Sequence, residues 1–278
     1  MVKKPTVGIG YRRAYRDALL ERESEIQSLE VLVEHFMPLT SSKTAELEAI
    51  AERFRVVLHG VSLSLGSIER PSSAYWRDLR SIGRITGAPY LGEHLSISRS
   101  GGYDIWHLSP VWRTRESLDT CLRNVDEVRS RTDLDFVVEN ITEQVSYGPQ
   151  EFSPGEFLIR LCEQSGSGFL FDIANLEINV ANNVPGHELD DIEYLARVPW
   201  VQMHVAGGSA EPDGYRIDSH SEPVESTTLN TLRRALRMQR PDTIVIEKDS
   251  NLDDFESLLQ DVSAVRQVVE EAVGVGRD

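Results

Sequence analysis

Cysteine is scarce in this sequence. Its 278 residues contain only Cys121 and Cys162, and neither forms a CxxC or a Cys–His spacing. Both fall in helix-like segments. A disulfide framework needs several paired cysteines, and a structural zinc site usually needs closely spaced thiolates. The sequence therefore argues against both, and we interpret the two cysteines as packing residues.

Long apolar runs are also missing. No run approaches the roughly 18 apolar residues that a membrane-spanning helix needs. The first residues, MVKKPTVGIGYRR, lead directly into a strand-like segment and not into the apolar core of a signal peptide. We therefore expect a cytoplasmic protein with no membrane partner.

Basic residues are in deficit. The chain has 29 lysines and arginines against 45 aspartates and glutamates, which gives a formal net charge of −16. Nucleic-acid binding needs a basic surface that neutralises phosphates, so this balance argues against a nucleic-acid partner. Most of the acids should solvate helix faces, but a carboxylate-rich metal site would add to the same balance.

Two glycine-rich signals are absent. A doubly wound nucleotide-binding sheet would carry a GxGxxG loop after its first strand, and the segment GIGYRR lacks that spacing. No Gly/Ser-rich linker or low-complexity stretch divides the chain. These absences favour a single domain that spans residues 1–278. They also favour a barrel rather than an open sheet.

Eight short apolar runs, rich in β-branched residues, alternate with helix-like stretches in the pattern of parallel βαβ units. The predicted strands are residues 7–11, 28–34, 55–60, 89–94, 135–140, 168–173, 200–205 and 243–249. Amphipathic helices are predicted between them, for example over residues 42–54, 114–131, 154–166 and 226–239. Because eight βα repeats match a closed barrel, we predict the α/β class and a single (β/α)8 TIM-type barrel with elaborated loops at its C-terminal face.

Histidines and acids recur where the predicted strands end, which is where such a barrel places its catalytic groups. Asp218 and His220 are expected in the loop after the seventh strand. The candidate metal ligands are His59, His94, Glu139, Asp172, His204, Asp218, His220 and Glu247. Since one metal takes about four to six ligands, this set would supply two or three ions. Imidazole and carboxylate ligands without thiolates suit iron, manganese or zinc.

Each candidate has a simpler interpretation. His59 or His94 alone could be a hydrogen-bonded core histidine, and Glu139 or Glu247 could belong to a buried ion pair. Eight such groups at one barrel mouth without a cation would suffer charge repulsion and desolvation. The joint pattern therefore predicts a metal site.

Other residues could support this site. Asn140 and Asn175 could orient the ligands, and Asn175 could itself coordinate. Glu34 ends the second predicted strand and His35 follows it; both are candidates to support the ligands or contact substrate, and His35 could be a ligand or line the mouth. Arg12 could pair with a substrate carboxylate or form a structural salt bridge.

Nine short segments, taken together and in their order along the chain, are more specific than any one of them. They are GIGYR at 8–12, LEVLVEHFM at 29–37, LHGVSLSLGS at 58–67, EHLSIS at 93–98, VENIT at 138–142, FDIANL at 171–176, QMHVAGG at 202–208, IDSHSEPV at 217–224 and IEKDSN at 246–251. The series resembles the multinuclear non-heme iron-dependent oxidases that modify ribosomally made peptides, typified by the methanobactin-biosynthesis oxidase. The resemblance spans nearly the whole chain.

The resemblance implies a TIM-type barrel whose eight matching residues, the candidates above, bind two or three irons in a mixed-valence Fe(II)/Fe(III) centre. It also implies dioxygen as co-substrate and oxidation of a precursor peptide, often at cysteine, in natural-product biosynthesis. Asp172, His204 and His220 are then the candidate catalytic residues. A separate leader-recognising partner protein is implied as well, because nothing in the chain resembles an added leader-binding domain.

The chain departs from the family pattern around the ligands. Glu34-His35-Phe36 stands where the family usually has Glu-Asn-Tyr, and a proline usual after the last acidic strand is absent from SNLDDF. The iron site is therefore predicted, but the product is not.

Three other functions stay open. One is a xylose-isomerase-like metal-dependent sugar isomerase or epimerase, which would use manganese, cobalt or magnesium and consume no oxygen. Another is a hydrolase of the endonuclease IV type with several zinc ions, which the acidic charge disfavours. The third is a non-catalytic metal-binding or peptide-binding scaffold.

Overall fold

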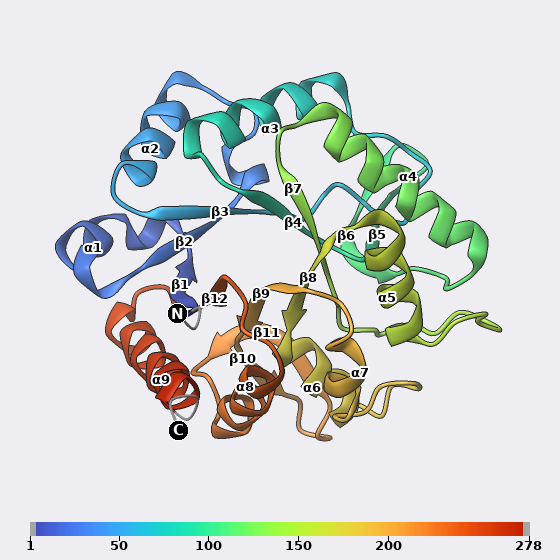
Figure 1. Cartoon of the computed structure of the whole chain (residues 1–278). Coiled ribbons are helices and arrows are strands. Elements are labelled where there is room, and N and C mark those ends of the chain that lie inside the picture. Colours follow the sequence, from blue (N-terminus) through green and yellow to red (C-terminus); the bar gives the residue numbers. More distant parts are fainter. Residues whose placement is uncertain (1–3, 275–278) are drawn as a thin grey trace. The chain divides into compact units, whose positions relative to one another are not determined.

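A closed barrel of eight parallel strands forms the centre of the fold. The computed structural model describes residues 4–274, so residues 1–3 and 275–278 of the predicted domain lie outside the described residues. The strand order is β1-β12-β9-β8-β7-β4-β3-β2 (labels in Figure 1). These strands are β1 (Thr6–Gly10), β2 (Ser28–Leu32), β3 (Arg55–Gly60), β4 (Tyr90–His94), β7 (Asp135–Glu139), β8 (Gly168–Asp172), β9 (Trp200–Val205) and β12 (Thr243–Ile246). Each of the eight predicted runs overlaps one of these strands, and the predicted barrel is confirmed.

Helices connect the strands. They are α1 (Arg16–Glu21), α2 (Ser41–Ala51), α3 (Ser73–Thr86), α4 (Arg115–Arg131), α5 (Pro154–Ser165), α6 (Ile173–Ala181), α7 (Asp191–Leu195), α8 (Ser226–Met238) and α9 (Phe255–Gly274), with 3-10 turns η1 (Arg13–Tyr15), η2 (Glu23–Glu25) and η3 (Val33–Phe36). The side chains of Thr40, Ser72, Thr114 and Ser153 cap the starts of α2, α3, α4 and α5 by accepting a backbone N–H. Within residues 4–274, every helix is too short or too polar to cross a membrane.

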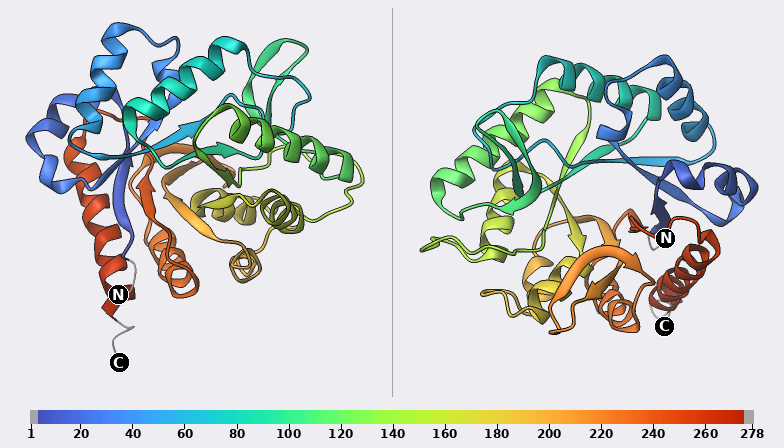
Figure 2. Two further views of the ribbon diagram at one scale, coloured as in Figure 1. Left: turned by 45° about the horizontal axis from the view of Figure 1, so that its top comes forward. Right: turned by 180° about the vertical axis from the view of Figure 1, so that it is seen from behind.

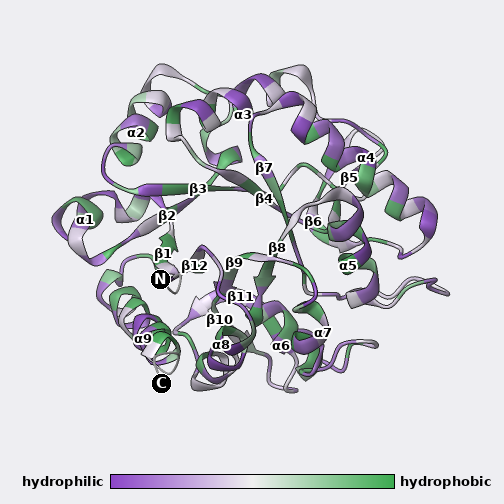
Figure 3. Cartoon of the chain, viewed as in Figure 1, coloured by the Kyte–Doolittle hydropathy of each residue, from purple (hydrophilic) through white to green (hydrophobic). Residues whose placement is uncertain are grey.

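The amphipathic pattern of the helices explains their packing. Figure 3 shows hydrophobic and hydrophilic residues alternating along α3 and α4. The apolar side of α3 buries Leu79 and Ile82, and that of α4 buries Val125 and Val128, all with no exposed surface. Full burial of one such side chain stabilises the fold by about 1.5–3 kcal/mol.

The chain divides into two compact units. The terminal unit comprises the chain up to Glu30 together with the chain from Leu170 onward, and the central unit comprises Val31–Phe169. In the terminal unit, β12 pairs in parallel with β1 and with β9, and α9 packs beside β1, as both views in Figure 2 show. In the central unit, β4 pairs in parallel with β3 and β7. Each unit thus contains neighbouring barrel strands.

Two β-hairpins were not predicted. One joins β5 (Ser96–Ser100) to β6 (Tyr103–Pro110) through Gly101 and Gly102, which both have positive φ (64° and 79°). Two such glycines suit the tight turn of a two-residue hairpin loop. The other joins β10 (Gly207–Ala210) to β11 (Arg216–Glu222).

The second hairpin corrects one prediction. Asp218 and His220 lie on β11 and not in a loop. The sequence of β11, RIDSHSE, has one apolar residue and so lacks the apolar–polar alternation that identifies a strand, and in the structure its residues are half-buried almost throughout. Strand β2 also ends earlier than predicted, at Leu32, which leaves Glu34 and His35 in η3.

Close strand contact makes Gly8 a test of the barrel packing. A Cβ added there would lie 2.2 Å from the carbonyl oxygen of Ser28 on the neighbouring strand, whereas a Cβ at Gly148 would meet nothing within 4 Å. We expect Gly8→Ala to lower the free energy of unfolding by about 1–3 kcal/mol, because the strands must move apart. Urea denaturation measures this, with Gly148→Ala as the control. Equal stability of the two variants would contradict the strand spacing.

Candidate metal-binding clusters

The central unit brings two histidines and a glutamate together at strand ends. His59 lies near the end of β3, His94 ends β4, and Glu139 ends β7. Oε2 of Glu139 is 3.3 Å from Nε2 of His59 and 3.3 Å from Nε2 of His94. His59 and Glu139 are buried, and the two imidazole rings meet edge to face. Both imidazoles therefore converge on one carboxylate oxygen.

This central cluster fits a metal ion. Two ligand atoms that each lie about 2.1 Å from one metal are about 3.0–3.4 Å apart, depending on the angle between them. The two 3.3 Å distances fall in this range, whereas a charge-assisted hydrogen bond is typically about 2.7–2.9 Å. Two imidazoles with one carboxylate suit iron, manganese or zinc. The donor set and its spacing could thus hold a metal ion.

The terminal unit holds a second cluster around His204. This histidine lies on β9, Asp172 ends β8, and Glu247 follows β12. Nδ1 of His204 is 3.3 Å from Oε2 of Glu247 and 3.8 Å from Oδ2 of Asp172. One ligand atom of each of these three buried residues lies within 4.8 Å of the other two. The ring nitrogen Nδ1 therefore faces the two carboxylates.

The other ring nitrogen of His204 is held by residues that the sequence analysis missed. Nε2 lies 2.9 Å from Oε2 of Glu30, on β2, and the amide of Gln202 donates to the same oxygen. All three residues are buried. The contacts of Nε2 with Glu30 and, at 2.7 Å, with the amide nitrogen of Gln202 hold the ring so that Nδ1 faces the other two carboxylates. Metal-bound histidines are commonly oriented in this way.

The sequence contained a signal for both missed residues. Glu30 is an acid inside the apolar run SLEVL, and Gln202 lies two residues before His204 on the same strand. Residues at this spacing share one face of a strand. A buried acid inside an apolar strand needs a partner, which could have drawn attention to Glu30.

His220 extends the terminal cluster. Its Nε2 is 2.7 Å from Oδ1 of Asp218 and 3.5 Å from Oε2 of Glu247, so Glu247 faces both histidines of this unit. Its Nδ1 is 2.9 Å from Oδ2 of Asp249. Arg12 donates to the other oxygen of Asp249. Arg12 thus forms the salt bridge that was the structural alternative to pairing with a substrate.

Electrostatics around His220 favour a cation. Burial alone would lower the pKa of His220, but the charge of Glu247 and the hydrogen bonds to Asp218 and Asp249 together raise this pKa well above its ordinary value. Burial likewise opposes ionisation of Asp249, but the contacts with His220 and Arg12 lower its pKa. A proton or a metal ion at Nε2 of His220 would neutralise the same excess of carboxylate charge.

The two carboxylate oxygens of Asp172 make different contacts. Its Oδ1 accepts the backbone N–H of Asn175 at 2.6 Å and so caps α6, while Oδ2 faces His204. The side chain of Asn175 is buried, and Asn140 is half-buried directly after β7. Their role in orienting ligands stays a prediction.

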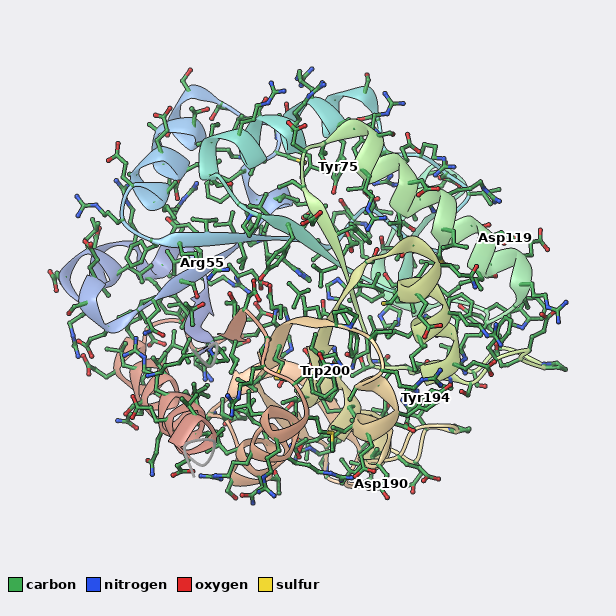
Figure 4. The ribbon with its side chains drawn as sticks, viewed as in Figure 1. Arg55, Tyr75, Asp119, Asp190, Tyr194 and Trp200 are labelled. Atoms are coloured by element: carbon green, nitrogen blue, oxygen red, sulfur yellow. The ribbon has the colours of Figure 1, made fainter. Side chains whose placement is uncertain are left out.

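Glu34 anchors the loop after β3. Its Oε1 accepts hydrogen bonds from the backbone of Val61 (3.2 Å) and Ser62 (3.1 Å), from the hydroxyl of Ser62 (2.7 Å) and from Tyr75 (3.3 Å), which projects from α3 (Figure 4). Burial, and then the charge of Glu93, raises the pKa of Glu34. His35 is exposed. Neither Glu34 nor His35 belongs to the His59–His94–Glu139 group.

All eight predicted ligands therefore lie in one of two clusters. The central unit assembles His59, His94 and Glu139, and the terminal unit assembles Asp172, His204, Asp218, His220 and Glu247.

Solved structures with a similar fold include a D-psicose 3-epimerase from Clostridium cellulolyticum, with a TM-score of 0.63 and 12% identity over 96% of this chain and 99% of that chain. Endonuclease IV from Thermus thermophilus has a TM-score of 0.58 and 15% identity over 96% of this chain and 100% of that one. At these identities the likeness shows the shared barrel fold alone.

Sequence relatives are proteins named UPF0276. The protein of Streptomyces avermitilis is 34% identical over an alignment of 276 residues, and the match covers 95% of this chain but 55% of that protein. The chain thus spans about half the length of this relative. The relative in Vibrio parahaemolyticus is 27% identical over 92% of this chain and 89% of its own length, and that in Caulobacter vibrioides is 28% identical over 93% and 92%.

The family described as RiPP precursor modification enzyme MbnB/TglH/ChrH matches residues 6–270, nearly the whole chain. The chain therefore belongs to this family.

Proposed function

We propose that this protein is a multinuclear iron-dependent oxidase that uses dioxygen to modify a precursor peptide, often at cysteine, in natural-product biosynthesis. One observation carries the proposal: a member of a peptide-modifying family contains two buried clusters built from imidazoles and carboxylates alone. Such ligands suit iron, and their number allows two or three ions.

The proposed roles follow from the geometry. In the central unit, His59, His94 and Glu139 would hold one ion. In the terminal unit, the carboxylates and His204 and His220 would hold one or two more, with Glu247 available to both histidines. When bound, mixed-valence Fe(II)/Fe(III) would supply the capacity to activate dioxygen.

The polypeptide itself would orient the metal ligands and exclude water from the clusters. Glu30 would keep Nδ1 of His204 directed at Asp172 and Glu247, and Asp249 would do the equivalent for Nε2 of His220. Burial of the clusters would exclude water that competes for the ligands. Asp172, His204 and His220 are the residues we propose as catalytic.

The substrate class follows from the family. Since this family acts on RiPP precursors, the substrate would be a ribosomally made precursor peptide. A separate protein that recognises the leader, a cytoplasmic location and a single domain over residues 1–278 remain predictions from the sequence.

Metal content tests the proposal directly. Protein purified without oxygen from iron-supplemented cells should contain two or three irons per chain and give a mixed-valence Mössbauer signal. Elemental analysis of the same sample gives the stoichiometry. Manganese or cobalt without oxygen consumption would favour the sugar isomerase, zinc the hydrolase, and the absence of bound metal the scaffold.

Ligand substitutions should remove iron from one unit at a time. We expect His94→Ala in the central unit and His204→Ala in the terminal unit each to lose about one iron and all peptide oxidation. Asp172→Ala should behave like His204→Ala. His187→Ala, outside both clusters, is the control. Full iron content and activity in the His204→Ala and Asp172→Ala proteins would refute the assignment.

Glu30 should matter although it is not a proposed ligand. Glu30→Ala removes the acceptor for Nε2 of His204, so we expect iron affinity to fall about 10- to 100-fold, as measured by chelator competition. Glu30→Gln keeps an acceptor oxygen and should lose less. If the alanine variant binds iron as tightly as the wild-type protein, Glu30 does not position His204.

A further inference from the structure

Two of the proposed ligands, Asp218 and His220, lie in an irregular part of β11. The register between β10 and β11 shifts there, so that residues 218–221 of β11 stand opposite the single residue Gly208 of β10. Such a β-bulge interrupts the ladder of backbone hydrogen bonds and redirects side chains, and bulges are frequent beside active sites. We call residues 218–221 the bulge.

The backbone of His220 has an uncommon conformation inside the bulge. Its φ is +46°, in the left-handed region that residues other than glycine rarely occupy. A conformation of this kind persists only where surrounding contacts hold it. Because the backbone conformation sets where the ring points, the same contacts determine that Nε2 of His220 faces Oε2 of Glu247 at 3.5 Å.

Three hydrogen bonds from the segment after β12 hold the bulge. The backbone N–H of Asp249 donates to the carbonyl of His220 at 3.0 Å. The next carbonyl, that of Ser221, accepts from Nζ of Lys248 at 2.5 Å and from the side-chain amide of Asn251 at 3.2 Å. Two successive carbonyls of the bulge are thus fixed by one short segment of chain.

Lys248 is a buried lysine, only 5% exposed. Lysine is almost never fully buried unless its charge is paired. Besides the carbonyl of Ser221, the charge of Lys248 acts on the buried Asp261, whose pKa is raised by burial and lowered in part by Lys248. Asp261 in turn accepts the backbone N–H of Val224, just beyond β11, at 3.1 Å. The ammonium group therefore lies where the end of β11 is anchored.

We propose that Lys248 and Asn251 are positioning residues for the terminal metal cluster. Through the carbonyl of Ser221 they hold the bulge in the conformation that directs His220 toward the cluster. The identity of the metal as iron rests on the proposed function, whereas the contacts with the bulge do not. The role explains why a lysine is buried one residue after the proposed ligand Glu247, since an ammonium group has no lone pair with which to bind a metal.

NMR of the metal-free protein tests the effect on His220. With ¹³C-labelled histidine, the Cα and Cβ shifts report the backbone conformation, and His220→Asn identifies the His220 signals. We expect Lys248→Met and Asn251→Gly to move these signals away from left-handed values, and the double variant to move them most, because each single variant leaves one side-chain donor to Ser221. Glycine accepts the φ of +54° at Asn251. Lys4→Met, which alters an exposed lysine of the same unit, should leave the signals unchanged.

Iron binding tests whether this conformation matters for the cluster. Ferrous iron alone is titrated without oxygen against a chelator, in a His94→Ala background that removes the proposed central ion. We expect each single variant to bind the terminal iron about tenfold more weakly and the double variant about 100-fold more weakly. Lys248→Arg keeps a charged donor and should recover part of the affinity.

The two measurements separate this role from the oxidase proposal. Wild-type His220 shifts in Lys248→Met, Asn251→Gly and the double variant would overturn the positioning role, even with weaker iron binding, because the residues would then act by another route. Moved shifts with unchanged iron affinity would overturn it as well. Moved shifts in a protein whose wild-type form binds no iron would support the hold on the bulge and contradict only the oxidase proposal. Circular dichroism verifies folding, and if Lys248→Met does not fold, the exposed Asn251→Gly decides.

Discussion

The burial of several carboxylates close to one another is the constraint on which the candidate site depends. In the terminal unit, Glu30, Asp172 and Glu247 are all buried around the single imidazole of His204. Ionised groups in such surroundings are costly unless donors or cations compensate them. The chain supplies donors where it can, through the amide of Gln202 and the start of α6. The carboxylate oxygens that face Nδ1 of His204 are those that a metal ion would satisfy.

The same constraint explains why each of the two histidines of this unit contacts an acid through the ring nitrogen that points away from the cluster. His204 uses Nε2 toward Glu30 and Nδ1 toward the cluster, whereas His220 uses Nδ1 toward Asp249 and Nε2 toward the cluster. Opposite ring nitrogens are therefore held by structural acids, and Arg12 fixes the acid behind His220. Such contacts hold a ring in one orientation before a ligand arrives, which lowers the entropy lost on binding. Arg12 therefore has a protein partner for its charge in Asp249.

The barrel and the hairpins contribute in different ways. Parallel strands fix His94 and Glu139 as direct neighbours in register, so their spacing depends on backbone hydrogen bonds. The hairpin β5–β6 instead presents exposed side chains and an open edge.

The sequence by itself determined the barrel strands, because each is a short apolar run that must be buried. It also indicated the eight proposed ligands, because six of them stand at or near the ends of those runs and Asp218 and His220 follow the seventh run. It also carried enough order in its motifs to indicate the family. The helices predicted over residues 114–131 and 226–239 followed from their 3.6-residue periodicity, as the burial of Val125 and Leu232 illustrates.

Tertiary structure alone decided which of these side chains meet. The pairing of Glu30 with His204 joins residues 174 positions apart, and that of Arg12 with Asp249 joins residues 237 apart. Local patterns carry no information about such contacts, since they depend on strand register and not on neighbouring residues. The hairpin that carries Asp218 and His220 was missed for a related reason: its half-buried strands are stabilised by cross-strand hydrogen bonds and lack the periodic hydrophobicity by which a sequence reveals its strands.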